Sequence, residues 1–161
     1  MSAVTKPESA DLLEIRSHFR CGTRPQYFYV ALLGLRSYEP LKIYARVSRG
    51  LSFSSFEHFR RNSSLDMDAL ADLIQVPART LARRKEEGRL EPDESDRLLR
   101  AARVFGRALE LFEGNADAAR EWLLDGQPLL GNLVPLRLAT TDVGALEVEH
   151  LIGRLEYGIP S

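Results

Sequence analysis

The stretch MDALADLIQVPARTLARRKEEGRL, residues 67–90, predicts two short helices joined by a tight turn. Apolar residues recur in its first part with the spacing of one helix face. Pro77 suits the first turn of the following helix, because its fixed φ matches helical geometry. Two such helices are the outline of a helix-turn-helix. The residues expected to pack the pair together are Leu70, Leu73, Ile74, Val76 and Leu81.

The second helix of this pair is strongly cationic. Residues 79–89 contain five Lys or Arg and two Glu. Arginine binds guanine through two parallel hydrogen bonds in the major groove, and Arg, Lys and Thr near a helix start can bind phosphates. A solvated face on an ordinary helical hairpin is the alternative interpretation. The side chains expected to point outward, and so the candidates for DNA binding, are Arg79, Thr80, Arg83, Arg84 and Lys85.

Helical periodicity continues on both sides of this pair. Residues 90–100, LEPDESDRLLR, begin like a helix, with Asp93 as its cap or first-turn acid. The segment PQYFYVALLGL at 25–35 is compatible with a strand or a buried helix, and periodicity does not decide between them. An aromatic stripe is more typical of a core than of a base-stacking platform. That stripe consists of Phe53, Phe56 and Phe59.

The last third of the chain predicts a set of short helices. Asn115 is expected to cap the first, and Pro135 to open a second. Thr141 or Asp142 would cap the last helix, and Gly158 would end it in a left-handed conformation. The first of these helices is expected to turn Trp122, Leu123 and Leu124 inward. The apolar stripe expected on the last helix is Val143, Leu146, Leu151, Ile152 and Leu155.

Composition excludes several classes of protein. The chain has 161 residues, and no apolar run approaches the roughly 20 residues of a membrane helix. The acidic N-terminal stretch does not resemble a signal peptide, so we expect a soluble cytoplasmic protein. The single cysteine, Cys21, and three scattered histidines predict neither a metal site nor a cofactor. No histidine is coupled to a nucleophile, so we do not expect an enzyme.

Charge is distributed unevenly along the chain. Residues 1–64 carry ten Lys or Arg against five Asp or Glu, whereas residues 114–161 carry three against seven. A basic front suits nucleic acid, and an acidic rear would be repelled by a phosphate backbone. We therefore expect three parts: an extension of uncertain role at 1–49, a helix-turn-helix domain at 50–112 and a small helical domain at 113–161.

Two longer motifs resemble the antitoxins of the Xre/MbcA/ParS family. RTLARRKEEGRLEPDESDRLLRAARVF, residues 79–105, is similar to the Xre-type helix-turn-helix. AREWL, the run LLGNLVPLRLATTDVGALEVEHLIGRLEYG and the terminal Ser161 are similar to the toxin-binding domain that follows it. The resemblance covers roughly residues 50–161 and implies an all-α fold with these two domains in this order.

The resemblance also implies a function. Antitoxins of this type neutralise a toxin of the RES class, which consumes NAD, by inserting their C-terminal region at its NAD-binding pocket. They also repress their own operon through the helix-turn-helix. One departure from the family pattern is Pro160, where an aromatic residue is expected. The residues implied to bind the toxin are Arg154, Glu156, Tyr157, Gly158 and Ser161.

Two alternatives stay open from the sequence. The chain end is also compatible with a helix terminus packed on its own domain, with Tyr157 covering Leu155. The whole chain is compatible with a stand-alone transcription regulator, whose C-terminal unit dimerises or senses a ligand. Whether the chain is an antitoxin or a stand-alone regulator, a helix-turn-helix that reads paired DNA half-sites favours a homodimer.

Overall fold

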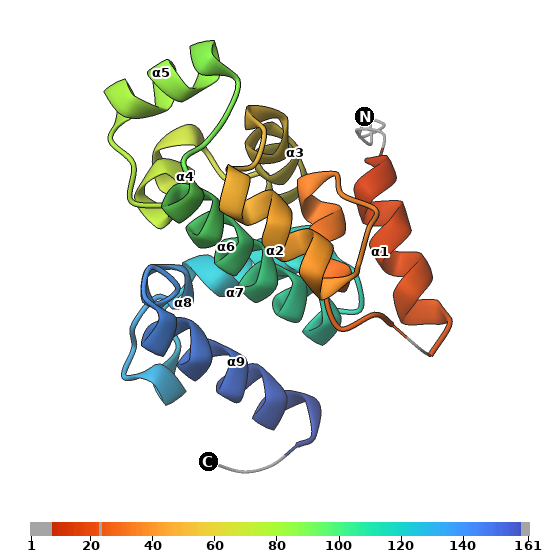
Figure 1. The fold of residues 1–161 in the computed structure, drawn as a ribbon. Helices are drawn as coiled ribbons and strands as arrows, with labels where there is room; N and C mark the ends of the chain where they lie inside the picture. Colours follow the sequence, from red (N-terminus) through yellow and green to blue (C-terminus); the bar gives the residue numbers. More distant parts are fainter. Residues whose placement is uncertain (1–7, 23, 159–161) are drawn as a thin grey trace, which may run out of the picture.

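The computed structural model describes residues 8–22 and 24–158, and these residues form a helical protein (Figure 1). Apart from two isolated bridges, Ser52 with Arg89 and Gln127 with Leu133, the regular structure within those ranges is helical. The predicted all-α class is confirmed. In chain order the elements are α1 Ala10–Arg20, η1 Phe28–Leu33, α2 Pro40–Arg49, α3 Phe53–Ser63, α4 Met67–Leu73, α5 Ala78–Glu87, α6 Pro92–Leu111, α7 Ala116–Leu124, η2 Pro128–Leu130, α8 Pro135–Leu138 and α9 Asp142–Glu156.

Helix α6 is the central element. It contacts η1, α2, α3 and α4, which precede it in the sequence, and α7 and α9, which follow it (Figure 1). Its start is fixed by a capping box, in which the side chains of Glu91 and Glu94 each accept a hydrogen bond from the other residue's backbone N–H. Asp93 is a first-turn acid rather than the cap. Its buried residues include Leu98, Ala102, Phe105 and Leu109.

The ambiguous segment at 25–35 forms the 3₁₀ helix η1, and every residue of this helix is buried. It packs against α6, α1 and α3. The close approach requires Gly106 of α6, because a Cβ there would lie 2.6 Å from the Cβ of Tyr29. The extension at 1–49, whose role the sequence left open, thus contributes η1 to the same core as α6.

The helix-turn-helix is present as α4 and α5. Asp66 caps α4 by accepting a hydrogen bond from the Ala69 amide at 2.7 Å. Pro77 is the N-cap of α5 and lies just outside its first turn. The five residues expected to pack the pair are buried, and so is the predicted aromatic stripe of α3.

The C-terminal helices begin and end close to their predicted positions. Asn115 caps α7, Thr141 caps α9, and Gly158 has the expected positive φ of 63°. Leu123 is buried within α7. Leu124 is exposed, so the prediction that it points inward is wrong.

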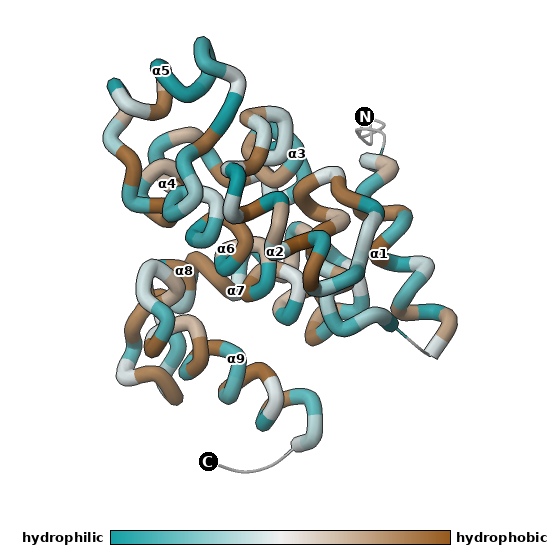
Figure 2. The backbone as a smooth tube through the Cα atoms, viewed as in Figure 1, coloured by the Kyte–Doolittle hydropathy of each residue, from teal (hydrophilic) through white to brown (hydrophobic). Residues whose placement is uncertain are grey.

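The predicted apolar stripe of α9 is only partly correct. The buried residues are Gly144, Ala145, Val148, Leu151 and Ile152, which lie on the face toward α6 and α8. Val143 and Leu146 are 74% and 41% exposed, and Leu155 is also exposed. Helical geometry places positions 143 and 146 away from the buried face defined by 145, 148 and 152. Figure 2 shows hydrophobic segments along α9.

None of the described helices is long and apolar enough to span a membrane.

Candidate functional site

The cationic face predicted on α5 is present at most of its positions. Arg79, Arg83 and Lys85 are exposed, and Thr80 is half-buried. The Nε of Arg83 lies 3.8 Å from the Oε1 of Glu87, and this ion pair is long and exposed. Among the described residues, neither Arg79 nor Lys85 has an ion-pair partner. These side chains are available to an anionic partner.

Arg84 is the exception, and the prediction that it points outward is wrong. Its Nε lies 2.9 and 3.1 Å from the two carboxylate oxygens of Glu94, and its side chain is 11% exposed. The hydrogen bond with Glu94 raises the pKa of Arg84, against the opposing effect of burial. Glu94 also belongs to the capping box of α6. Arg84 therefore joins α5 to the start of α6.

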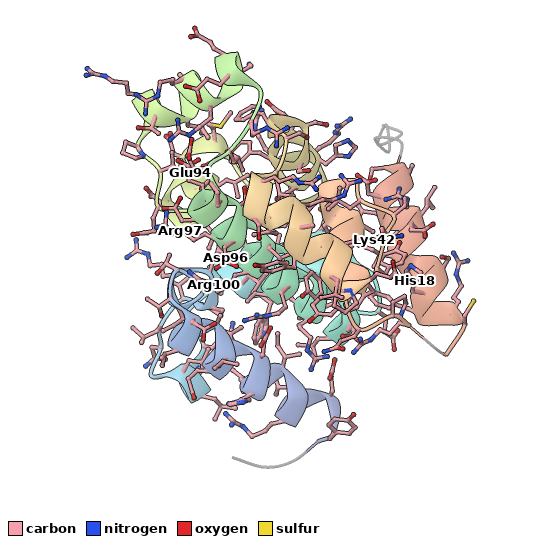
Figure 3. All side chains as sticks on the ribbon, viewed as in Figure 1. His18, Lys42, Glu94, Asp96, Arg97 and Arg100 are labelled. Carbon is pink, nitrogen blue, oxygen red and sulfur yellow. The ribbon has the colours of Figure 1, made fainter. Side chains whose placement is uncertain are left out.

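Four arginines of α6 connect this helix to elements that precede it and follow it in the chain. Two of them, Arg97 and Arg100, are labelled in Figure 3. Arg97 donates to the carbonyl oxygen of Ile74, the C-cap residue of α4, at 3.2 Å. Arg100 donates to the carbonyl oxygens of Ala139 and Thr140, which follow α8, at 3.2 and 2.9 Å. Positive groups are favourable at such helix ends.

The other two arginines bind acids of α9. Arg103 donates to Glu149 at 2.6 Å, and Arg107 to Glu156 at 3.2 Å. The sequence analysis gave none of these four arginines a role. Their spacing, at 97, 100, 103 and 107, is the signal of a single helix face and was available in the sequence.

A second candidate surface lies on the C-terminal helices, where apolar side chains are exposed. Exposed apolar residues of this kind are candidates for contact with another protein. Acidic residues Asp125, Asp142 and Glu147 are exposed on the same helices and loops. The apolar residues of this surface are Leu124, Leu129, Leu133, Val143, Leu146, Leu155 and Tyr157.

The structure separates the residues predicted at the chain end. Tyr157 is 80% exposed, so it does not cover Leu155 as the packing alternative required. Glu156 is engaged by Arg107, and the Nε of Arg154 is buried without a hydrogen-bond partner among the described residues. Gly158 is exposed. Ser161 and Pro160 lie outside the described residues.

Acidic and histidine side chains do not form a metal site in the part of the chain that the structure describes, because no three of His, Cys, Asp or Glu gather there. His58 is instead part of a polar cluster. Its Nδ1 lies 2.7 Å from the buried carboxylate of Asp11, which also accepts hydrogen bonds from Arg36 and Asn62. This cluster joins α1 to α3 and to the segment after η1.

Comparison with known proteins matches two families along the chain. The antitoxin Xre-like helix-turn-helix domain matches residues 42–103, and the antitoxin Xre/MbcA/ParS C-terminal toxin-binding domain matches residues 107–158. Both the cationic face of α5 and the exposed apolar surface fall inside these matches, the first in the helix-turn-helix and the second in the toxin-binding domain.

Individual relatives agree with these matches. An antitoxin Xre of Yersinia enterocolitica is 35% identical over 114 residues, which is 70% of this chain and 77% of the relative. An antitoxin Xre of Photorhabdus laumondii is 32% identical over 73% of this chain and 80% of its own length. An antitoxin Xre of Pseudomonas putida is 36% identical over 52% of each chain.

Proposed function

Because the chain belongs to the Xre/MbcA/ParS family of antitoxins, we propose that it neutralises a RES-class toxin by blocking the toxin's NAD-binding pocket with its C-terminal region. The proposal includes autoregulation, in which the same chain binds operator DNA through α5. In this proposal the chain acts as a binding protein in the cytoplasm.

The observation that carries the toxin-binding proposal is the exposure of apolar side chains on the C-terminal helices. Val143 and Leu146 extend from the first turns of α9, and Tyr157 extends from its end. An aromatic residue with a polar hydroxyl is a frequent anchor in protein interfaces, because it combines a large apolar area with a hydrogen bond. In this proposal a toxin covers these residues and receives the chain end in its pocket.

The DNA-binding proposal is supported by α5, whose start is exposed and cationic. Arg79 and Thr80 are the second and third residues of α5, and in helix-turn-helix proteins residues near the start of this helix reach the base edges. Arg83 and Lys85 follow one turn later and suit phosphate contacts. Because such operators contain paired half-sites, we propose that the antitoxin binds as a homodimer.

Co-expression tests the toxin proposal. We expect the product of the adjacent toxin gene to deplete cellular NAD when expressed alone, and the full antitoxin to restore the NAD level. A chain lacking residues 154–161 should fail to restore NAD although it still binds operator DNA. Full protection by this truncated chain would show that the chain end does not block the pocket. A toxin that leaves NAD untouched would exclude the RES class.

Operator binding is tested separately with Arg79→Ala. We expect an affinity loss of about tenfold or more, and a shallower dependence on salt, because a contact to base or phosphate is lost. Arg120→Ala is the matched control, since Arg120 is an arginine of α7 whose partner is Asp117. Equal losses in both variants would point to nonspecific electrostatics. No loss in Arg79→Ala would remove α5 as the DNA-reading helix.

A further inference from the structure

A chain of four alternating charges connects the N-terminal part of the protein to the end of α9. Arg24, in the loop before η1, donates to Glu110 of α6 at 2.5 Å. Glu110 also accepts from Arg107 at 2.7 Å, and Arg107 donates to Glu156 at 3.2 Å. The guanidinium of Arg24 lies over the ring of Phe28, 4.7 Å from its centroid. The path therefore runs from the start of η1 to the last residue of α9.

These four charges line an open cleft of about 840 Å³ between the end of α1, the end of α6 and the end of α9. The side chains of Arg107 and Glu156 are both 22% exposed, so water screens them only in part. Burial works against the charge of Arg107, but its bonds to Glu110 and Glu156 outweigh this effect and raise its pKa. Each of these four charges thus lies next to an opposite charge.

Glu156 lies where a carboxylate is unfavourable without a positively charged partner. A carboxylate in the last turn of a helix faces the negative end of the helix dipole, which is unfavourable. Ile152 is the last buried apolar residue of α9. Leu155 and Tyr157 are exposed, so neither packs the last turn of the helix against the core. Arg107 pairs with Glu156 and so attaches this turn to α6.

We propose that the charge chain Arg24–Glu110–Arg107–Glu156 is a positioning device that fixes the direction of the segment 156–158 at the end of α9. The inference rests on the proposed function, because that segment is what would enter the toxin. Glu156 is then a positioning residue rather than a toxin contact, and Tyr157 is the residue it presents. Arg24 gives the N-terminal part of the protein a role in toxin neutralisation, although it lies far from the chain end in sequence.

The expected size of the effect follows from population shift. When only a fraction of molecules holds the segment in the competent direction, the apparent affinity falls by that fraction. If release of Glu156 leaves about a tenth of the molecules competent, toxin affinity falls about tenfold. Operator binding does not depend on the segment and stays unchanged.

The test uses the full chain with Arg107→Gln, Arg107→Lys, Glu156→Gln and the double variant Arg107→Gln/Glu156→Gln. Arg120→Gln is the matched control, because it removes the exposed i,i+3 pair of α7. Amide hydrogen exchange over residues 153–158 is measured in the free protein, and toxin and operator affinities are measured by titration. We expect about tenfold faster exchange and about tenfold weaker toxin binding in Arg107→Gln. Operator affinity should match wild type.

The other variants separate positioning from direct contact. Glu156→Gln should resemble Arg107→Gln, the double variant should be no weaker than either single variant, and Arg107→Lys should retain most of the affinity. Arg24→Gln should shift both readouts in the same direction by a smaller amount. Unchanged exchange in Arg107→Gln overturns the inference, and so does a double variant whose losses add. If instead the chain lacking residues 154–161 still inhibits the toxin, the proposed function itself has failed.

Discussion

Residues of one type have different roles on the same helix. Arg79 and Arg84 both belong to α5, yet Arg79 is exposed and Arg84 is bonded to Glu94 of α6. The sequence showed a cluster of cations and predicted a single outward face. The direction of each side chain depends on where α6 begins, which the local pattern does not contain. The sequence was sufficient to predict that α5 is cationic. It was not sufficient to predict that Arg84 is the arginine that bonds to α6.

Arg84→Gln should therefore lower stability and weaken DNA binding only indirectly. We expect a loss of about 1 to 2 kcal/mol in the free energy of unfolding, because a charged hydrogen bond to the buried carboxylate of Glu94 disappears. Urea denaturation measures the loss. Arg79→Ala is the matched control and should unfold like wild type. An Arg84→Gln protein of unchanged stability would show that the pair with Glu94 contributes little.

A second residue-scale prediction concerns pH and the cluster around Asp11. Burial raises the pKa of this carboxyl, but hydrogen bonds from Asn62, His58 and Arg36 outweigh burial and leave the pKa below its usual value. A lowered folded-state pKa means that the carboxylate stabilises the fold above the unfolded pKa of about 4. This stabilisation disappears as the pH falls through the folded-state value.

We expect Asp11→Asn to unfold at lower temperature than wild type at pH 6, by the equivalent of about 2 kcal/mol. The difference in Tm between the two proteins should shrink as the pH falls from about 5 to about 2, because wild type then loses the same interaction. Thermal unfolding followed by circular dichroism gives both curves. A difference that stays constant across this range would mean that the Asp11 charge does not contribute.

Among the elements, those with strong local signals were predicted well. The caps at Asn115 and Thr141 and the left-handed Gly158 gave the start of α7 and both ends of α9 to within a residue or two. The segment at 25–35 was ambiguous because its helical part, Phe28–Leu33, is buried at every position and so has no periodicity of its own. The exposed side of α9 was also missed, because exposed apolar residues look like core residues in a sequence.

Two glycines of the long helices test the packing of elements. Gly106→Ala places a Cβ 2.6 Å from the Cβ of Tyr29, so α6 and η1 must separate, at a cost of about 1 to 3 kcal/mol. Gly153→Ala in α9 is the matched control, because its new Cβ approaches no closer than 4.0 Å to the Nη2 of Arg107. That variant should gain roughly 0.5 to 1 kcal/mol from helix propensity. Denaturant titration of both variants measures the change in the free energy of unfolding, which should have opposite signs. Equal changes in the two variants would contradict the packing argument.

At the scale of the whole molecule, α6 separates two surfaces. Figure 1 shows α5 at one side of the fold and the end of α9 at the opposite side. The arginines of α6 hold α4 and the loop after α8 through backbone carbonyls, and hold α9 through carboxylates. A rigid connection of this kind keeps both surfaces in fixed positions and places neither in the way of the other.

This separation predicts that toxin and operator bind at the same time. Toxin added to the antitoxin–operator complex should give a slower-migrating band in a gel-shift experiment, with operator affinity altered by less than about threefold, since no surface is shared. Arg79→Ala should lose the DNA band and keep the toxin complex. Leu146→Ser, which changes an exposed side chain of α9, should do the reverse. Release of DNA at the toxin concentration that saturates the antitoxin would show that the two surfaces are coupled, either by overlap or through α6.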